Sequence, residues 1–333
     1  MRTPEGVLIP PFQRRPSQVA IRRVASYEQN LVDILYESLC EFQKSSAGLQ
    51  DTGPATETHR PIGAIRGKTV LLKPNFVGLD PLGCMNTHPA VVAAARESFL
   101  RLGAARVLIG DGPAMDRDTE AIVESVRLRE FIGPLERTFV DLNVDDVTRV
   151  PLTTRASRLR ELYFPNTLLR ADFVVSMPKL KTHHWAAVTL SLKNMFGTVP
   201  GGCYGWPKNV LHWAGIDRSI LDINAAVRPD FAIVDGIVGM EGNGPIQGTP
   251  KPANVLILGD DPVAVDATCC RIMGLRPERV KHIAGAGTML GHVSANRIEQ
   301  LGESVASLRT PFAVLKEFEK LREGGKATRL AAI

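Results

Sequence analysis

Cysteine, aromatic side chains and long apolar runs are all scarce in this sequence of 333 residues. Its 5 cysteines show no CxxC spacing, so we expect neither a disulfide framework nor an intrinsic iron–sulfur cluster. No apolar run approaches the roughly 20 residues that cross a bilayer, and the N-terminus lacks the apolar block of a signal peptide. We therefore expect a cytoplasmic protein without a membrane partner.

Neither sign of charge is in strong excess, since 40 Lys and Arg stand against 35 Asp and Glu, a net charge of +5. The arginines are scattered instead of forming one basic run, so we expect no nucleic-acid partner. No HExxH pair and no GxSxG elbow occurs, so there is no local sign of a zinc protease or a serine hydrolase. The 44% hydrophobic content is enough to bury one large core or two coupled ones.

Hydrophobic periodicity predicts an α/β fold from Lys68 onward. Short β-branched runs predict strands, and apolar positions at helical spacing predict helices between them. The predicted strands are residues 69–72, 106–109, 138–141, 173–176, 231–234 and 254–258, and the helices are residues 89–102, 118–131, 210–226, 262–273 and 311–322. This alternation is typical of a mostly parallel sheet with helices on both faces, in one lobe or two.

The chain divides into three predicted parts. Residues 1–60 form an N-terminal extension with one amphipathic helix, at residues 27–42, followed by a polar, turn-rich segment at residues 45–61. Residues 61–300 form the α/β catalytic domain. Residues 301–333 form a C-terminal helix and tail.

Polar motifs follow four of the predicted strands. Because the reactive groups of an open parallel sheet collect just past the carboxyl ends of its strands, these motifs predict a shared site. Asp-Gly and Pro-Asn are also ordinary turn formers, so one or two of the four could be turns alone. The motifs are Lys73-Pro74-Asn75, Asp111-Gly112-Pro113, Lys179-Leu180-Lys181-Thr182-His183-His184 and Asp235-Gly236.

Candidate proton carriers and anion binders are densest in residues 177–202, MPKLKTHHWAAVTLSLKNMFGTVPGG. Lys193, next to Asn194, lies in an otherwise apolar stretch where an unpaired ammonium would be costly to bury, so it is the strongest anion-binding candidate. His88 and His183 are candidates for general acid and base, because imidazole titrates near neutrality. Alternatively, His88 with Pro89 marks the start of a helix, and one ring of the His183 pair is structural.

Metal binding is left open by the sequence. His88, His183, His212 and Glu241 come from separated segments, and neutral imidazoles with one carboxylate suit a divalent transition metal. His212 fits a core position equally well. Glu241 lies among glycines whose backbone can approach a ligand closely, but the glycine spacing in GMEGNGPIQG is not that of the dinucleotide fingerprint.

Seven segments together carry a family resemblance. They are LLKPNFVG, NTHPAVV, IGDGP, MPKLKTHH, TLSLKNMFGTVPG, VDGIVGMEGNGPIQGTPK and GDDPVAVDA. In this order, over about residues 68–290, the chain resembles the family named domain of unknown function 362. Many relatives, often labelled iron–sulfur-centre proteins, append a ferredoxin-like cysteine cluster that this chain lacks. The family name implies little about chemistry.

A more distant resemblance is to lactate racemase-type proteins, through His88, His183, Lys193 and His212. In those enzymes two histidines flank the substrate carbon, and the lysine and a histidine hold a nickel-pincer nucleotide cofactor. The SLK context of Lys193 differs from the Gly-Gly-Pro/Arg-Lys of those enzymes. The resemblance therefore implies a shared scaffold and anion site more than a shared reaction, and we do not expect that cofactor, although the sequence leaves it open.

The sequence thus predicts an enzyme, an isomerase or a lyase, that binds a small anionic, carboxylate-bearing metabolite and moves protons at a neighbouring carbon. Isomerisation, elimination and cyclisation, as in biosynthetic pathways, all fit this chemistry. The anion would be held by Lys179, Lys181 and Lys193. His88 and His183 would be acid and base, and Asp111 or Asp235 would fix a tautomer. The remaining predicted substrate contacts are Lys73, Asn75, His184, Asn194 and Glu241.

Two functions of other classes stay open. The first is a non-catalytic carrier that delivers a metal or a cofactor to a partner. The second is a redox enzyme that works with a separate iron–sulfur partner. The sequence also leaves open whether the chain forms a homo-oligomer.

Overall fold

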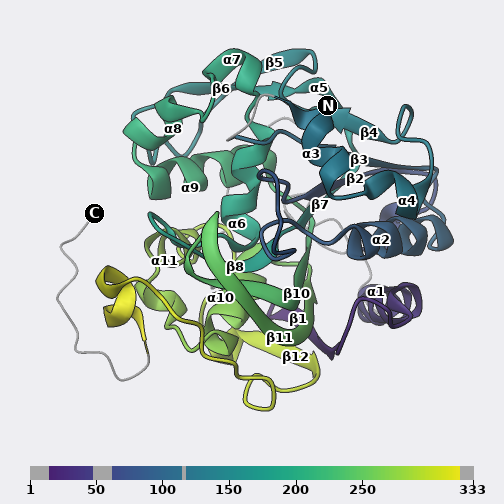
Figure 1. Cartoon of the computed structure of the whole chain (residues 1–333), viewed down its shortest axis with the longest axis vertical. Coiled ribbons are helices and arrows are strands. Elements are labelled where there is room, and N and C mark those ends of the chain that lie inside the picture. The colour runs from purple at the N-terminus through teal and green to yellow at the C-terminus, as the bar shows by residue number, and fades with distance from the viewer. Residues whose placement is uncertain (1–14, 48–61, 115–117, 323–333) are drawn as a thin grey trace.

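The computed structural model describes residues 15–47, 62–114 and 118–322. Most of the turn-rich segment at residues 45–61 lies outside this part of the chain. The predicted mixed α/β fold with a mostly parallel sheet is confirmed: a 10-stranded sheet runs through the molecule, and helices cover both of its faces (Figure 1).

The main path of the sheet has eight strands. From edge to edge they are β12 (Ile298–Gly302), β1 (Ser17–Arg23), β11 (Gln247–Gly259), β10 (Phe231–Asn243), β7 (Phe173–Met177), β2 (Thr69–Pro74), β3 (Arg106–Asp111) and β4 (Phe139–Asp141). The strands from β10 to β4 are parallel, whereas β11 is antiparallel to both of its neighbours. The carboxyl ends of β7, β2 and β3 therefore meet at one edge.

Two short, buried strands continue the sheet at this edge. β8 (Lys179–His183) runs parallel to the second half of the long strand β10, and β9 (Ala187–Val188) pairs antiparallel with β8. The segment after β7, predicted as a loop, is therefore strand for most of its length. A separate hairpin is formed by β5 (Val147–Pro151) and β6 (Glu161–Pro165).

Strand β1 was not predicted, and its burial explains why. Val19 and Ile21 face one hydrophobic core, while Ala20 between them faces the other. A strand covered on both faces has no alternation of apolar and polar residues to reveal it. Residues 17–23, within the predicted N-terminal extension, thus belong to the central sheet, and the predicted helix of that extension is present as α1 (Leu31–Ala47).

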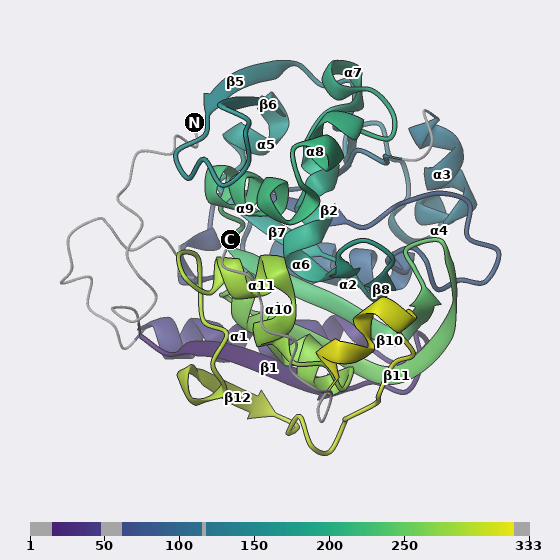
Figure 2. The ribbon, with the colours of Figure 1, turned by 90° about the vertical axis from the view of Figure 1, so that its left-hand side faces the viewer.

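The helices form two layers. On one face α1 packs against α2 (Pro89–Arg101), which contacts α4 (Leu128–Ile132) and, through it, α3 (Thr119–Ser125). On the other face lie α6 (Leu190–Asn194), α9 (Ile216–Val227), α10 (Pro262–Ile272) and α11 (Lys281–Ala286), as Figure 2 shows. The remaining short helices are α5 (Asn166–Arg170), α7 (Gly201–Tyr204) and α8 (Asn209–Trp213).

Three predicted helices differ from the structure. The helix expected at residues 210–226 is α8 and α9, divided at Gly215, whose φ of 98° lies outside the helical region. The helix expected at residues 118–131 is α3 and α4, divided where Arg127 has a φ of 59°. The helix expected at residues 311–322 is wrong, since only Lys316–Leu321 is helical, as 3₁₀ turns.

Candidate functional site

A cavity of about 210 Å³ opens where the carboxyl ends of β2 and β3 meet β8 and α6. Parallel strand ends form such a crevice because the chain leaves each strand there for a loop. Of the residues predicted for the site, those that line the cavity are Lys73, Asn75, Asp111, Lys181, His183, His184, Lys193, Asn194 and His212. Those that do not line it are His88, Lys179, Asp235 and Glu241.

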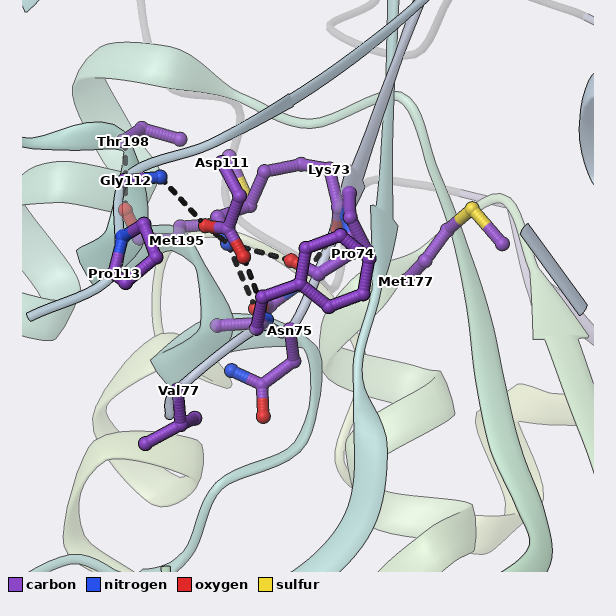
Figure 3. A network of polar contacts seen from close by, with 12 residues as sticks. Lys73, Pro74, Asn75, Val77, Asp111, Gly112, Pro113, Met177, Met195 and Thr198 are labelled. Atoms are coloured by element: carbon purple, nitrogen blue, oxygen red, sulfur yellow. Dashed lines mark hydrogen bonds and ion pairs between the residues drawn. The ribbon is translucent and has the colours of Figure 1, made fainter. Parts of the chain in front are cut away.

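A buried ion pair between Lys73 and Asp111 forms the floor of the cavity (Figure 3). The Lys73 ammonium also donates to Asn194 Oδ1 at 3.1 Å. The Asp111 carboxylate accepts from the backbone N–H of Phe76 at 2.6 Å and of Gly112 at 2.8 Å. Burial lowers the pKa of Lys73, and the charge of Asp111 opposes this shift. Because both charges are already paired, they shape the cavity and do not offer a free charge to a ligand.

The ion pair leaves no room for a side chain at Gly197. A Cβ on Gly197 would lie 2.5 Å from Lys73 Nζ and 2.7 Å from Asp111 Oδ1. Lys208, a residue that the sequence analysis missed, is fully buried beside this pair and donates to the Gly112 carbonyl at 2.7 Å. Burial lowers the pKa of Lys208 to about 7.

The short helix α6 carries Lys193 to the cavity, and Asp266 of α10 holds that helix in place. The buried Asp266 carboxylate accepts from the backbone N–H of Ser191 at 2.7 Å and of Leu192 at 2.9 Å. Those groups belong to the first turn of α6, whose N–H donors have no partner within the helix. Asp266 therefore caps α6 from outside, which fixes the position of Lys193 two residues further on.

The Lys193 ammonium is available to an anion. Among the described residues it makes no hydrogen bond or ion pair, and its Nζ lies 4.0 Å from the centre of the Phe196 ring. Burial, assisted by the positive charge of Lys73, lowers the pKa of Lys193 to about 7. An anion that enters the cavity would restore the charged form, because an opposite charge nearby favours it.

Lys181 adds a second ammonium group to the lining of the cavity. Its side chain is fully buried, and its Nζ donates to the Met85 carbonyl at 2.7 Å. Burial lowers the pKa of Lys181 to about 7, and the nearby charges of Lys179 and Lys193 also lower it. The cavity therefore contains two ammonium groups without a carboxylate bonded to either.

His183 is held as a neutral hydrogen-bond donor. Its Nδ1 accepts from the backbone N–H of Trp185 at 3.0 Å and of Ala186 at 3.2 Å. Since an N–H can only donate, the neutral ring carries its proton on Nε2. Burial, followed by the charge of Lys193, holds the pKa of His183 well below its ordinary value. In this arrangement Nε2 has no lone pair for a proton or a metal ion.

His184 and His212 have the opposite tautomer. Nδ1 of His184 lies 2.9 Å from the Gly244 carbonyl, and Nδ1 of His212 lies 3.2 Å from the Lys208 carbonyl. Because a carbonyl can only accept, each neutral ring carries its proton on Nδ1 and has a lone pair on Nε2. Burial, with the charge of Lys193, lowers the pKa of His212 to about 4, so this ring is neutral at pH 7. These two rings can accept a proton.

The rings form one continuous wall. The distances between ring centres are 5.0 Å from His183 to His184, 4.8 Å from His184 to Trp185, and 5.1 Å from Trp185 to His212. Phe196 continues the wall at 5.4 Å from His212. The ring that donates from Nε2 and the two rings that donate from Nδ1 therefore stand along one side of the same cavity as Lys193.

Two buried polar atoms at the cavity have no partner among the described residues. They are Asn75 Oδ1 and Thr189 Oγ1, and both side chains line the cavity. In Figure 3 the Asn75 amide points away from the ion pair of Lys73 and Asp111. Buried polar groups are normally hydrogen-bonded, so these two atoms can accept a hydrogen bond from a water molecule or a polar ligand in the cavity. Thr189 gave no sequence signal beyond its place in the dense segment.

The structure places His88, Lys179 and Asp235 in a separate buried network. Lys179 Nζ donates to Asp235 Oδ2 at 2.7 Å and to the Tyr27 hydroxyl at 2.9 Å. The His88 ring stacks on Tyr27 at 3.7 Å between centres, and its Nδ1 accepts from the backbone N–H of Ala90. His88 therefore caps α2, which is the alternative that the sequence analysis left open, and Lys179 is already paired.

Glu241 and the metal candidates are dispersed. Glu241 Oε2 accepts from the backbone N–H of Ala313 at 2.8 Å and lies 3.4 Å from Lys251 Nζ, outside the cavity. Of the four candidate metal ligands, only His183 and His212 line the cavity. In the described ranges no group of three or more His, Cys, Asp and Glu side chains is placed to hold a metal ion. The donor set therefore does not fit a metal-centred site, and no step is derived through one.

No helix within the described residues is both long and apolar enough to pass through a membrane. A family model described as a domain of unknown function (DUF362) matches residues 70–271. A thylakoid-associated protein of Synechocystis is 30% identical to this chain over 227 residues, which is 66% of this chain and 67% of that protein.

Two solved structures also show a likeness. The lactate racemase apoprotein of Thermoanaerobacterium thermosaccharolyticum has 14% identity and a TM-score of 0.33, and the match covers 68% of this chain and 51% of that one. A Thermotoga maritima protein has 12% identity and a TM-score of 0.33, with 72% and 58% covered. The match thus spans only about half of each of these two proteins.

Proposed function

Because the chain belongs to the family described as a domain of unknown function (DUF362), whose description assigns no reaction, we propose a function from the cavity: an enzyme that binds a small carboxylate and transfers a proton at a carbon next to it. The observation that carries this proposal is the arrangement around Lys193. An ammonium without an anionic partner shares a cavity with one imidazole that donates from Nε2 and two that can accept there.

The anion binds at the Lys193 ammonium, and the Lys181 ammonium contributes a second positive charge. A carboxylate beside Lys193 replaces the water that an exposed ammonium would hold, and it supplies the counter-charge that the described residues do not. Asn75 and Thr189 then provide hydrogen bonds to polar groups next to the carboxylate. Lys73 has no such role, because Asp111 already neutralises it.

Proton transfer is assigned to the ring wall. His184 or His212 removes a proton from the carbon next to the carboxylate, because each has an Nε2 lone pair. Negative charge then develops on the substrate oxygen. The Nε2–H of His183 and the two ammonium groups stabilise that charge, as a fixed neutral imidazole does in other proton-transfer enzymes. Isomerisation, elimination and cyclisation all begin with this step.

This assignment changes the roles expected from the sequence. His183 becomes the donor instead of the base, since its Nδ1 is occupied by two backbone N–H groups. His88 leaves the mechanism, since it lies in the network with Tyr27 and does not line the cavity. Asp111 and Asp235 fix no tautomer, because carbonyl and N–H groups of the backbone do so.

Solvent exchange tests the proposal without a known substrate. The protein is incubated in D₂O with a panel of small carboxylates, and deuterium at carbon is followed by NMR and mass spectrometry. We expect exchange into at least one acid. Replacing the base should slow it by about 10²–10⁴-fold, so His184→Gln and His212→Gln together identify that residue.

The matched control is His88→Asn, because asparagine is also a good N-cap and preserves the start of α2. We expect it to keep the exchange rate of the natural sequence. Full exchange in both cavity variants, or a comparable loss in the control, would overturn the assignment. If no acid exchanges and native mass spectrometry finds a stoichiometric tightly held cofactor, the carrier function replaces the enzymatic one.

A further inference from the structure

An exposed tryptophan stands at the outer end of the ring wall. Trp185 is 58% exposed and lies in the turn between β8 and β9. Its ring meets those of His184 and His212 edge-on, at interplanar angles of 81° and 68°. Ile246, which is 36% exposed, also lines the cavity. A large aromatic ring that is held by two neighbouring rings and is more than half exposed can stack on another ring.

The polarity of the cavity changes from its inner to its outer end. The inner end has the Lys193 ammonium and the two unpartnered atoms, Asn75 Oδ1 and Thr189 Oγ1. The outer end has the indole of Trp185 and the aliphatic side chain of Ile246. A ligand that matches both ends has an anionic, hydrogen-bonding head and an apolar body.

We propose that this outer end, formed by Trp185 and Ile246, is a subsite for an aromatic ring, and that the substrate is a monocyclic aryl-substituted carboxylate. This inference rests on the proposed function, since it assumes that the carboxylate binds at Lys193. It makes Trp185 a specificity-determining residue. Short polar acids would fill the inner end and leave the indole face exposed to water.

The size of the cavity limits the class further. Its volume of about 210 Å³ exceeds the roughly 150 Å³ of a cavity that accommodates benzene. It lies below the roughly 300–1,000 Å³ of pockets for drug-sized ligands and cofactors. One ring with a short carboxylate arm fits these limits.

Binding of two probe acids tests the subsite separately from catalysis. Phenylacetate carries the proposed ring, acetate carries only the carboxylate, and phenylacetamide carries the ring without the charge. Titration calorimetry and NMR line broadening measure each dissociation constant. Burying the phenyl ring should make phenylacetate bind about ten- to a hundredfold more tightly than acetate.

Two tryptophan variants locate the effect. Trp185→Ala should weaken phenylacetate binding by about tenfold and leave acetate binding unchanged. Trp213→Ala is the matched control, because Trp213 is 80% exposed on α8 but does not line the cavity. We expect it to bind both acids as the natural sequence does.

The outcomes separate the two proposals. If acetate and phenylacetate bind equally well, and Lys193→Gln weakens both, the anion site stands and the aromatic subsite is refuted. If Trp185→Ala and Trp213→Ala weaken phenylacetate equally, the ring binds elsewhere and the subsite is again refuted. If Lys193→Gln changes neither acid, the anion site of the proposed function fails, and the inference fails with it.

Discussion

Anion binding at Lys193 should depend on pH in a way that its surroundings determine. Burial and the charge of Lys73 lower the pKa of Lys193 from 10.5 to about 7. Only the protonated form attracts a carboxylate. Below pH 7 the ammonium is already charged and binding is constant, whereas above pH 7 a proton must be taken up before the anion binds. Affinity should therefore fall as pH rises through 7.

The magnitude follows from this single proton. Each pH unit above the pKa of the free protein weakens binding tenfold, or about 1.4 kcal/mol, until the higher pKa of the complex is reached. Between pH 7 and pH 9 the dissociation constant of phenylacetate should rise by about fiftyfold, because half of the ammonium is already deprotonated at pH 7. The probe stays ionised throughout, and His212, with a pKa of about 4, stays neutral.

Calorimetric titrations from pH 6 to pH 9 measure this dependence, and two variants at Lys193 assign it. Lys193→Arg keeps its charge over the whole range, so its binding should keep only the smaller pH dependence that comes from Lys181. Lys193→Gln should bind weakly at every pH. Lys181, whose pKa is also about 7, titrates in the same window, so a pH dependence in Lys193→Arg as large as that of the natural sequence would transfer the effect to Lys181 and refute the reasoning.

Two further predictions concern the scaffold of the site. Gly197→Ala should lower the free energy of unfolding by about 2–4 kcal/mol in urea titrations, because its Cβ would push apart the buried ion pair. The control Gly78→Ala, with nothing within 4 Å of its Cβ, should change the free energy of unfolding by less than about 0.5 kcal/mol. Equal effects of the two substitutions would contradict this account. Asp266→Ala leaves two buried N–H groups of α6 unsatisfied, so thermal unfolding should show a free energy of unfolding lower by about 2–5 kcal/mol, and phenylacetate should bind more weakly. Asp266→Asn should lower the free energy of unfolding by less. Unchanged phenylacetate binding in both variants would show that the position of α6 does not determine the anion site.

The sequence predicted the strands of the central sheet better than the helices around it. β2, β3 and β7 were found because each is a short β-branched run between clear breaks. β1 was missed because burial on both faces removes its alternation, and the C-terminal helix was wrong because residues 311–322 have apolar spacing but form only 3₁₀ turns. The helical spacing of apolar residues also continues across Gly215, but the φ of 98° at this residue interrupts the helix.

The lining of the cavity was predicted in part, and the part that was missed depends on long-range contacts. Lys73, Asn75 and Asp111 were found because the ends of parallel strands converge. Lys179 and Lys181 look alike in sequence, but two residues of a strand advance by roughly 7 Å, which places Lys179 on Asp235 and Lys181 at the cavity.

The protonation patterns of the histidines had no sequence signal. His184 depends on a carbonyl sixty residues further along the chain, at Gly244, and His183 depends on the turn that follows it. The side chain that caps α6, Asp266, is likewise 75 residues from Ser191. Such partners are set by the folded arrangement and not by local pattern.

The position of β1 has a consequence for how this protein can be divided. The recognised family segment, residues 70–271, contains β11 but excludes both β1 and β12, which continue the sheet beyond it. Expressed alone, that segment would leave residues 255–259 of β11, which pair with β1 in the full chain, without a neighbouring strand, and such an edge is a template for self-association. The family segment and the central sheet therefore have different boundaries, and a fragment that keeps the whole sheet must retain residues from both ends.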